Sequence, residues 1–410
     1  MTMEPTQSFW LNQSPYEDFQ STPELPRKSE VVVIGGGITG VSTAYWLRSN
    51  DVEVTLLEQR GLSGGATGRN AGGIAPGPAE RLSQVVKRYG PDTARDIWNY
   101  TYECTQAIKQ FVIEHQVDCN LSFSGRVSLA LSLAELSQLQ EEADFLTRHG
   151  RPVEYWDAAT CVQRIHSTAF RGGLFSPEGG SLWPAKLVFG IAEQALRLGA
   201  NIQAQTEVHA IESENNSLIV KTARGNVQAQ HVVYATNAWT RHLLPFLSDT
   251  IRPVRGQMVI TQPVLHLWPY GLSTNFGYEY WGQRTDGRIV LGGMRWLTST
   301  REENNEDDTA IEPMVSKGLH EFLPKHFPEL QDVQVEQEWT GIMGFTPDGN
   351  PLIGPLPGRP GEYIAAGFSG HGMSVTFYAG KTVAEMIVGQ EPENFVEVFL
   401  PMRFAEAFAC

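Results

Sequence analysis

The sequence contains few of the features that mark disulfide-rich or metal-binding proteins. Its 410 residues include four cysteines, with no CxxC pair and no metal-ligand spacing: Cys104, Cys119, Cys161 and Cys410. This pattern argues against a disulfide scaffold, a structural zinc site and a redox-active dithiol. Buried or incidental thiols in a reducing compartment are expected, and no metal site is predicted.

Long apolar runs and basic clusters are also missing. No run approaches the roughly 20 apolar residues that span a bilayer, and the N-terminus lacks the pattern of a signal peptide. The net charge is −15, without the Lys/Arg clusters that phosphate contacts need. We therefore expect a cytoplasmic protein that binds neither membrane nor nucleic acid. The acidic run EENNEDD, residues 302–308, is predicted to be a solvated loop.

The length and an apolar fraction of 41% suit two folded domains. Segments with strand–turn–helix character recur near residues 30–75, 185–240 and 340–390, so the domains are expected to be interleaved. Residues 1–28 are predicted to be an irregular extension, packed on the surface if ordered, and residues 396–410 a C-terminal tail. The dinucleotide-binding domain is assigned to residues 29–90, 160–250 and 338–395, and the substrate domain to residues 91–159 and 251–337.

The segment EVVVIGGGITGVSTAYWLRSNDVEVTLLEQ carries a dinucleotide-binding pattern. Gly35, Gly37 and Gly40 satisfy G-x-G-x-x-G between a predicted strand and a predicted helix. A helix N-terminus at such a turn favours a pyrophosphate. Glu58 ends the second predicted strand, where a carboxylate can accept hydrogen bonds from ribose hydroxyls. An acid there disfavours the 2′-phosphate of NADP, but the motif alone leaves NAD and FAD open.

The stretch SGGATGRNAGG, residues 63–73, favours FAD. Five glycines in eleven residues suit a backbone that runs along an extended ligand, where a Cβ would collide. Arg69 and Asn70 are candidates for polar contacts to flavin or phosphate. The alternative interpretation is a flexible surface linker, which the embedded Arg-Asn-Ala does not favour.

Four segments together resemble the FAD-dependent D-amino acid oxidase superfamily: VVVIGGGITG, SGGATGRNAGG, HVVYATNAW, and TPDGNPLIGPLPGRPGEYIAAGFSGHGMS. The resemblance covers nearly the whole chain and is strongest to the gamma-glutamylputrescine oxidase, glycine oxidase and sarcosine oxidase branch. It implies an α/β (α+β) fold, with a Rossmann-like FAD-binding domain and an interleaved substrate domain on a mixed, largely antiparallel sheet. It also implies oxidation of an amine to an imine by hydride transfer to flavin, with O2 as the common oxidant of reduced flavin.

The matched segments and the dinucleotide motif together supply the predicted FAD-binding residues. The segment GFSGHGMS is expected to direct the backbone N–H groups of residues 370–373, and a helix that opens at Ser374, toward the anionic reduced flavin. The full predicted set is Gly35, Gly37, Ile38, Thr39, Gly40, Glu58, Gln59, Gly65, Ala66, Thr67, Arg69, Asn70, Ala71, Gly72, Val208, Ala235, Trp239, Gly341, Gly370, His371, Gly372, Met373 and Ser374.

Departures from the family pattern bear on substrate and flavin attachment. Met343 stands where members that bind α-amino acids carry an arginine, so such substrates are disfavoured unless Arg284 or Arg295 reaches the cavity. A longer amine, polyamine derivative or N-alkyl amine fits better. The attachment positions of relatives hold Gly341 and Asn70, which predicts non-covalent FAD. The oxygen-activating lysine of sarcosine oxidase would fall at Val290, which leaves a dehydrogenase open.

The segment NFGYEYWGQRTDGRIVLGGMRW is predicted to form two strands joined by a turn. Its aromatic residues, Tyr278, Tyr280, Trp281 and Trp296, suit an amine cavity, although alternate aromatics also build ordinary cores. The predicted catalytic residues are His371, Tyr280, Arg295 and Met343; His371 is not assigned as a general base, and a purely structural role for it stays open. Two further functions stay open: a flavin monooxygenase, and a non-enzymatic protein that retains FAD structurally.

Overall fold

The glycine-punctuated segment near the N-terminus forms the predicted strand–helix–strand unit. The computed structural model describes residues 4–12, 14–16, 18–215 and 217–408. In it, β1 spans Lys28–Ile34, α2 spans Ile38–Ser49 and β2 spans Val54–Leu57. The apolar runs of both strands are buried because the strands lie inside a parallel sheet that is covered on its faces.

This unit belongs to an eight-stranded sheet, which we call the nucleotide sheet. Its order is β17-β18-β11-β1-β2-β8, with the β9–β10 hairpin attached to β11. The pairings of β1 with β2 and β11 are parallel, while β17 pairs antiparallel to β18. Helix α2 packs against both α6 and α9. The bounds are α6 Pro184–Arg197, β8 Asn201–Gln203, β9 Val208–Glu214, β10 Ser217–Thr222, β11 Gly225–Tyr234, α7 Thr240–Leu243, β17 Leu352–Pro355, β18 Glu362–Ala366 and α9 Thr376–Ile387.

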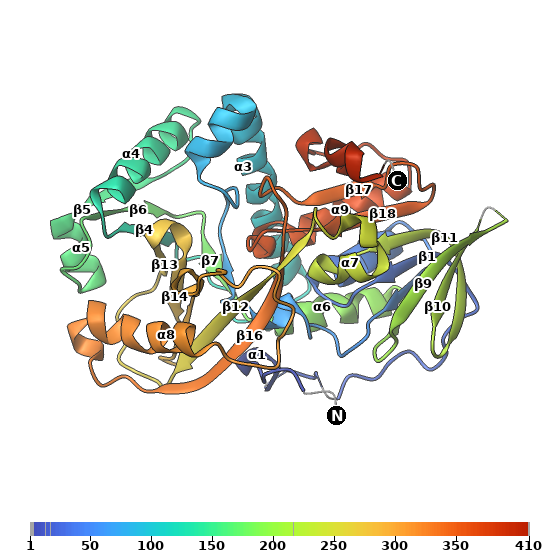
Figure 1. The fold of residues 1–410 in the computed structure, drawn as a ribbon, viewed down its shortest axis with the longest axis horizontal. Coiled ribbons are helices and arrows are strands. Elements are labelled where there is room, and N and C mark those ends of the chain that lie inside the picture. Colours follow the sequence, from blue (N-terminus) through green and yellow to red (C-terminus); the bar gives the residue numbers. More distant parts are fainter. Residues whose placement is uncertain (1–3, 13, 17, 216, 409–410) are drawn as a thin grey trace.

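A second eight-stranded sheet, the substrate sheet, has the order β16-β12-β15-β14-β13-β4-β6-β5. All its pairings are antiparallel except that of β13 with β4. Helices α5 and α8 join a buried apolar cluster on one face. The long strands β12 and β16 run between the two lobes of the molecule (Figure 1). The bounds are β4 Arg126–Ala130, β5 Glu154–Asp157, α5 Ala158–Ile165, β6 Gly172–Ser176, β12 Arg252–Thr261, β13 Gly271–Thr274, β14 Glu279–Gln283, β15 Ile289–Gly292, α8 Pro313–His326 and β16 Val335–Phe345.

Two helices and a small ribbon complete the frame around the junction of the lobes. Helix α3, Leu82–Glu114, is broken at Gly90 (φ +85°), directly before Pro91, because neither residue suits a helix interior. Helix α4, Leu133–Arg148, begins with a capping box between Ser132 and Glu135. Strands β3, Gly73–Ile74, and β7, Gly180–Ser181, pair as a two-stranded ribbon.

The N-terminal extension is largely irregular and lies at the surface, as predicted, except for one short segment that is helical and buried. Residues 9–12 form helix α1, Phe9–Asn12, and the side chains of Phe9 and Trp10 are buried. The indole of Trp10 donates to the carbonyl of Asn70 at 2.5 Å, which fastens the extension to the glycine-rich loop. Aromatic residues in a polar stretch were the signal for this burial. Residues 1–3, 13 and 17 of the extension lie outside the described residues.

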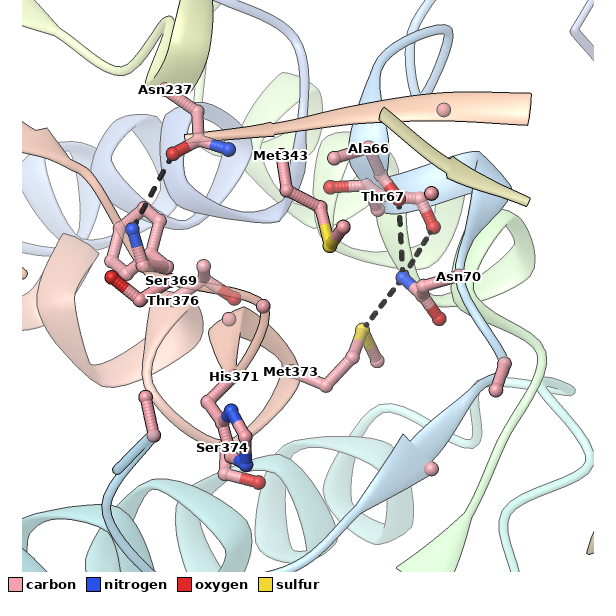
Figure 2. A pocket seen from close by; sticks show the side chains of 18 of the residues that line it. Ala66, Thr67, Asn70, Asn237, Met343, Ser369, His371, Met373, Ser374 and Thr376 are labelled. Atoms are coloured by element: carbon pink, nitrogen blue, oxygen red, sulfur yellow. Dashed lines mark hydrogen bonds between the residues drawn. The ribbon is translucent and has the colours of Figure 1, made fainter. Parts of the chain in front are cut away.

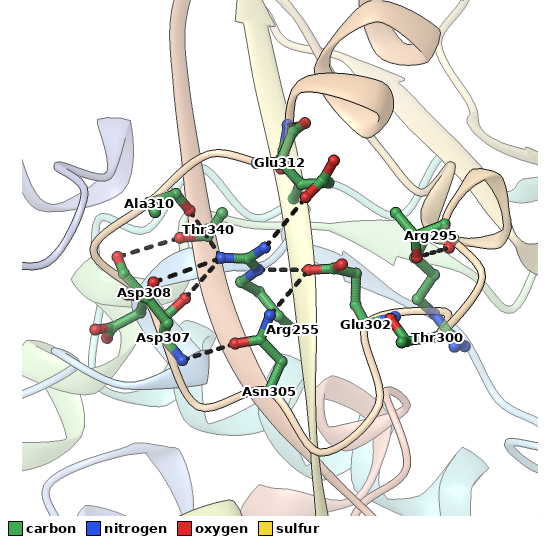
Figure 3. Close-up of polar contacts among 12 residues, drawn as sticks. Arg255, Arg295, Thr300, Glu302, Asn305, Asp307, Asp308, Ala310, Glu312 and Thr340 are labelled. Atoms are coloured by element: carbon green, nitrogen blue, oxygen red, sulfur yellow. Dashed lines mark hydrogen bonds and ion pairs between the residues drawn. The ribbon is translucent and has the colours of Figure 1, made fainter.

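The acidic run 302–308 is a loop that is only partly solvated, because Glu302 and Asp308 are buried while Glu303, Asn304 and Asp307 are exposed. Arg255 of β12 donates from Nε to Glu302 at 2.5 Å and from Nη1 to the carbonyl of Asp307 (Figure 3). Asp308 forms an ion pair with Arg60 at 2.7 Å. The run therefore closes over a buried cation with its two ends, while residues between them face water.

Cys104, Cys119 and Cys161 are buried free thiols, while Cys410 and residue 409 of the tail lie outside the described residues. Within the described part of the chain, no helix has the length and apolar character needed to cross a bilayer.

Candidate functional site between the two sheets

One cavity of about 960 Å³ lies between the lobes, near the upper end of the usual range for small-molecule sites. Its walls come from the turn after β1, the end of β2, the glycine-rich loop, the segment before α9, and one face of the substrate sheet. Segments far apart in the sequence thus meet around one space.

The turn after β1 has the geometry of a pyrophosphate site. Gly35 has φ +112°, and a Cβ there would approach the carbonyl oxygen of Ala235 to 2.6 Å. A Cβ on Gly40 would lie 1.8 Å from the oxygen of Gly35, so α2 can pack this closely only with glycine. No side chain caps α2 at Gly37, and the N–H of Ile38 donates to Thr67 Oγ1 at 3.3 Å. The first turn of α2 is thus presented to the cavity, as at anion-binding helix N-termini.

Glu58 is held by backbone N–H groups on both sides. Its Oε2 accepts from Gly36 at 2.6 Å and its Oε1 accepts from Arg60 at 2.7 Å. Burial raises the pKa of the Glu58 carboxyl above its ordinary value, while these two N–H groups act in the opposite direction. Each oxygen keeps a further lone pair for a ligand hydroxyl.

The two polar side chains of the glycine-rich loop bond to protein. Arg69 is buried, and its guanidinium donates to the carbonyls of Gly64, Thr6 and Thr340 at 3.0, 2.7 and 2.8 Å. Asn70 Nδ2 donates to the carbonyl of Thr67, and its Oδ1 accepts from the N–H of Gly72. These bonds shape the loop and join it to the extension and β16. Arg69 and Asn70 therefore border the cavity with side chains that are already held by hydrogen bonds to the protein.

Residues 368–374 form a further part of the wall, next to the glycine-rich loop. Figure 2 shows Met343 and Met373 extending into the pocket, with the sulfur of Met373 facing Asn70 Nδ2 at 3.2 Å. His371 lies beside Ser374, and its buried Nδ1 has no hydrogen-bond partner within the described residues. Burial and then the charge of Arg126 lower the pKa of His371 to about 4. The imidazole is therefore neutral at pH 7.

The substrate sheet presents a mixed aromatic and charged wall. Tyr280 of β14 points its hydroxyl at the sulfur of Met258, and burial raises the pKa of that hydroxyl. The guanidinium of Arg295 lies over the rings of Tyr278 and Phe345, 4.9 and 5.2 Å from their centroids. Arg295 thus reaches the cavity, which removes one objection to a carboxylate-bearing substrate.

All predicted cofactor residues except Gly40 and Gly72 line this cavity, as do all four predicted catalytic residues. Gly40 and Gly72 instead pack against backbone, Gly72 so closely that a Cβ would lie 2.3 Å from the oxygen of Leu182. Trp296 lies outside the cavity wall and donates to Glu279 at 2.6 Å. Arg284 also lies outside it and stacks on Trp183.

Several charged residues of the cavity wall were missed, and two of them lie on the substrate sheet and on the helix that packs against it. Arg126 lies on β4 and Glu142 on α4, and both face the space between the lobes. The alternation of RVSLA, with Arg126 and Ser128 on one face and Val127 and Leu129 on the other, was a signal for a half-buried strand.

The cavity fits an extended dinucleotide with a reactive ring. A Cβ at Gly65 or Gly73 would meet no protein atom within 4 Å, so backbone lines open space there. Glu58 offers acceptors at one part of the cavity, and His371 offers an unused ring nitrogen at another. Fold and site together are typical of a dinucleotide-binding enzyme, with two sheets and one large cavity between them.

Comparison with known proteins gives the family. Residues 30–386 match the DAO family, described as FAD dependent oxidoreductase, and the chain belongs to this family of FAD-dependent enzymes. It is 28% identical to the gamma-glutamylputrescine oxidoreductase of Escherichia coli, over 89% of this chain and 85% of that protein.

Two solved structures share the fold. The L-proline dehydrogenase of P. horikoshii superposes with a TM-score of 0.81 at 26% identity, over 93% of this chain and 99% of that one. The glycine oxidase of Geobacillus kaustophilus gives 0.80 at 21% identity, over 92% and 98%. The predicted family, fold class and FAD dependence are confirmed.

Proposed function

We propose that the protein oxidises the C–N bond of a primary or secondary amine, or of an amino acid derivative, to an imine. The main support for this proposal is one shared cavity. The glycine-rich turns of one domain and the aromatic and charged sheet of the other both line it. The names of the relatives, which specify gamma-glutamylputrescine, proline and glycine, support a substrate with an oxidisable C–N bond.

The residues of the nucleotide-domain wall would hold FAD, which would supply the hydride acceptor for this oxidation. The substrate carbon gives up a hydride and the nitrogen a proton, and water later hydrolyses the imine. We propose that FAD is bound non-covalently, since no cysteine of the described residues lines the cavity. His371 serves as a neutral hydrogen-bonding group, because its low pKa makes it a weak base at pH 7.

The remaining wall binds the amine. The rings of Tyr278 and Tyr280 offer apolar and π-surface to an alkylamine. Burial keeps Tyr280 protonated, so its hydroxyl remains a donor. Arg295 adds positive charge, which favours the unprotonated form of a nearby amine by disfavouring the ammonium. The unprotonated amine is the form that can release a hydride.

Reoxidation by O2 with release of H2O2 is the outcome that the resemblance to the oxidase branch implies, and a dehydrogenase that uses another acceptor is the second candidate. Val290, at the position of the oxygen-activating lysine in sarcosine oxidase, is buried among Met258, Ile260 and Trp339. No lysine of the described residues lines the cavity. These observations favour the second candidate.

Anaerobic mixing of the purified holoprotein with primary amines, N-methyl amines, polyamines and amino acids tests the proposal. Bleaching of the flavin band by at least one class is expected, and H2O2 formation on readmission of air would identify an oxidase. Bleaching by NADPH alone would contradict the proposal in favour of a monooxygenase. A protein that lost no colour with any of these donors would contradict it as well.

A further inference from the structure

The most informative unassigned feature of the molecule is the pair Arg126 and Glu142 on the substrate-side wall. Arg126 belongs to the same face of β4 as Ser128, and Glu142 belongs to α4, which packs over β4. Both side chains line the cavity. Neither residue is used by the oxidation steps described above.

Arg126 is poorly neutralised. Its Nη2 donates to Ser128 Oγ at 3.3 Å and to Ser273 Oγ at 3.5 Å, both of them long contacts with neutral groups. Among the described residues, no carboxylate oxygen lies within 4.0 Å of its guanidinium nitrogens. Burial lowers the pKa of Arg126, and the charge of Glu142 acts against that change. A guanidinium in this setting has most of its five donors available to a ligand.

The sheet leaves space beside this cation. In the register of the strands, Arg126 stands opposite Gly271 of β13, which in turn stands opposite Gly282 of β14. The three residues occupy one row on the cavity face, next to the row of Ser128, Ser273 and Tyr280. A Cβ at either glycine would meet nothing within 4 Å. The wall therefore has a shallow floor beside the guanidinium instead of side chains.

Glu142 is the negative counterpart across this space. Its carboxylate has no hydrogen-bond or ion-pair partner in the described part of the chain. Burial raises its pKa, while the charge of Arg126 lowers it. The two groups thus influence each other without forming an ion pair. Two opposite charges held apart and facing one cavity present a dipolar subsite.

We propose that Arg126 and Glu142 form a subsite for a substrate that carries both a carboxylate and an N–H donor. The carboxylate lies against Arg126 above Gly271 and Gly282, where Ser128 and Ser273 add hydroxyl donors. A neutral amine or amide N–H of the same molecule faces Glu142. The inference rests on the proposed amine oxidation and adds that the substrate is an amino carboxylate. The carboxylate anchor is thereby on β4, and not at position 343, which holds Met343.

Matched ligand pairs test this subsite in the holoprotein. The reactive pair is 4-aminobutanoate and 4-aminobutanamide, and the same comparison is made with glycine and glycinamide, each mixed anaerobically while flavin bleaching is followed. The unreactive pair is butanoate and butanamide, followed by the perturbation of the flavin absorption band at equilibrium. The second pair reports binding without turnover.

We expect the wild-type protein to bind each carboxylate at least tenfold more tightly than its amide. Arg126→Gln is expected to reduce that ratio to near one, as loss of a charge-assisted bond in a partly buried site costs a factor of ten or more. Glu142→Gln is expected to weaken the binding of the amino carboxylates and to leave the binding of butanoate at least as tight as in the wild type. The matched controls are Arg171→Gln and Glu141→Gln, both exposed and outside the cavity wall.

The experiment distinguishes failure of the subsite from failure of the proposed oxidation. The subsite is overturned if Arg126→Gln leaves the ratio of carboxylate affinity to amide affinity unchanged. It is also overturned if only amines without a carboxylate bleach the wild-type flavin. If no amine bleaches the wild-type flavin, the proposed oxidation fails, while butanoate binding still decides on the subsite. Should Arg126→Gln fold poorly, Arg126→Lys, which keeps the charge without the bidentate fork, is expected to retain part of the ratio.

Discussion

The two walls of the cavity are built in different ways. The nucleotide-domain wall is made of backbone, and its polar side chains Glu58, Arg69 and Asn70 bond to neighbouring N–H and C=O groups. The substrate-domain wall is made of side chains, and Arg126, Glu142 and Arg295 have no ion-pair partner within the described residues. A common cofactor is recognised by a fixed backbone shape, whereas substrate choice depends on polar groups that stay available. The two walls should therefore respond differently to mutation.

The largest effect is expected for Gly40→Ala in the nucleotide-domain wall. Because the new Cβ would lie 1.8 Å from the carbonyl oxygen of Gly35, α2 would be displaced from β1. We expect a loss of about 3 kcal/mol or more in the free energy of unfolding, measured by urea denaturation. Gly282→Ala in the other wall, where a Cβ meets nothing within 4 Å, should leave the unfolding curve unchanged. Equal curves for both variants would refute the contrast.

Next in size is Glu302→Gln, which tests how the substrate sheet is supported. This change removes the charge facing the buried Arg255 (Figure 3), and an uncompensated buried charge costs about 3–5 kcal/mol. Thermal unfolding would show the loss, and the exposed neighbour Glu303→Gln serves as control. A wild-type midpoint for Glu302→Gln would mean that Asp307 and Glu312, at 3.9 Å, suffice for Arg255.

A smaller and more selective effect is expected for Gly65→Ala. The added Cβ meets no protein atom within 4 Å and enters the space assigned to FAD. The apoprotein should unfold as the wild type does, while FAD affinity should fall at least tenfold, or about 1.4 kcal/mol, in a fluorescence titration. Undiminished affinity would show that the loop does not contact the cofactor.

The smallest effect concerns the pH dependence of stability through His371. Its pKa is about 4 in the folded protein and 6.5 in the reference state. The unfolded chain therefore binds the proton first, and the folded protein loses stability as the pH falls from about 6.5 to about 4. We expect this acid loss to be smaller in His371→Gln, because glutamine has no group that titrates in this pH range. Parallel stability curves for the two proteins would contradict the assignment.

The backbone-built wall was predictable from sequence, and the side-chain-built wall was only partly so. A glycine pattern between a strand and a helix fixes local geometry, and therefore residues 35–40 and 63–73 could be assigned to one site from their order and spacing. Arg126 and Glu142 face the same cavity because α4 packs over β4, and the space beside Arg126 exists because β4 pairs with β13 at Gly271. Neither contact leaves a local signature in the sequence.

The buried parts of the extension and of the acidic run were missed for a related reason. Phe9, Trp10 and Glu302 lie in segments that are mostly polar, and each is buried by a partner that is distant in the sequence. Local composition describes the average of such a segment. Which residue of such a segment becomes buried depends on the partner that packs against it. A short sequence pattern does not identify that partner.

The hydrogen bonds of Thr6 show that the start of the chain can fold completely only after a late part of the chain has been synthesised. Its hydroxyl accepts from the N–H of Thr340, 334 residues further on. At about 5–20 residues per second, the ribosome produces that partner some 20–70 s after it produces Thr6. Phe9 and Trp10 pack on Trp183, and their cluster is completed only when the same strand supplies Trp339. The first residues of the chain therefore cannot reach their final packing until more than three hundred later residues have been made.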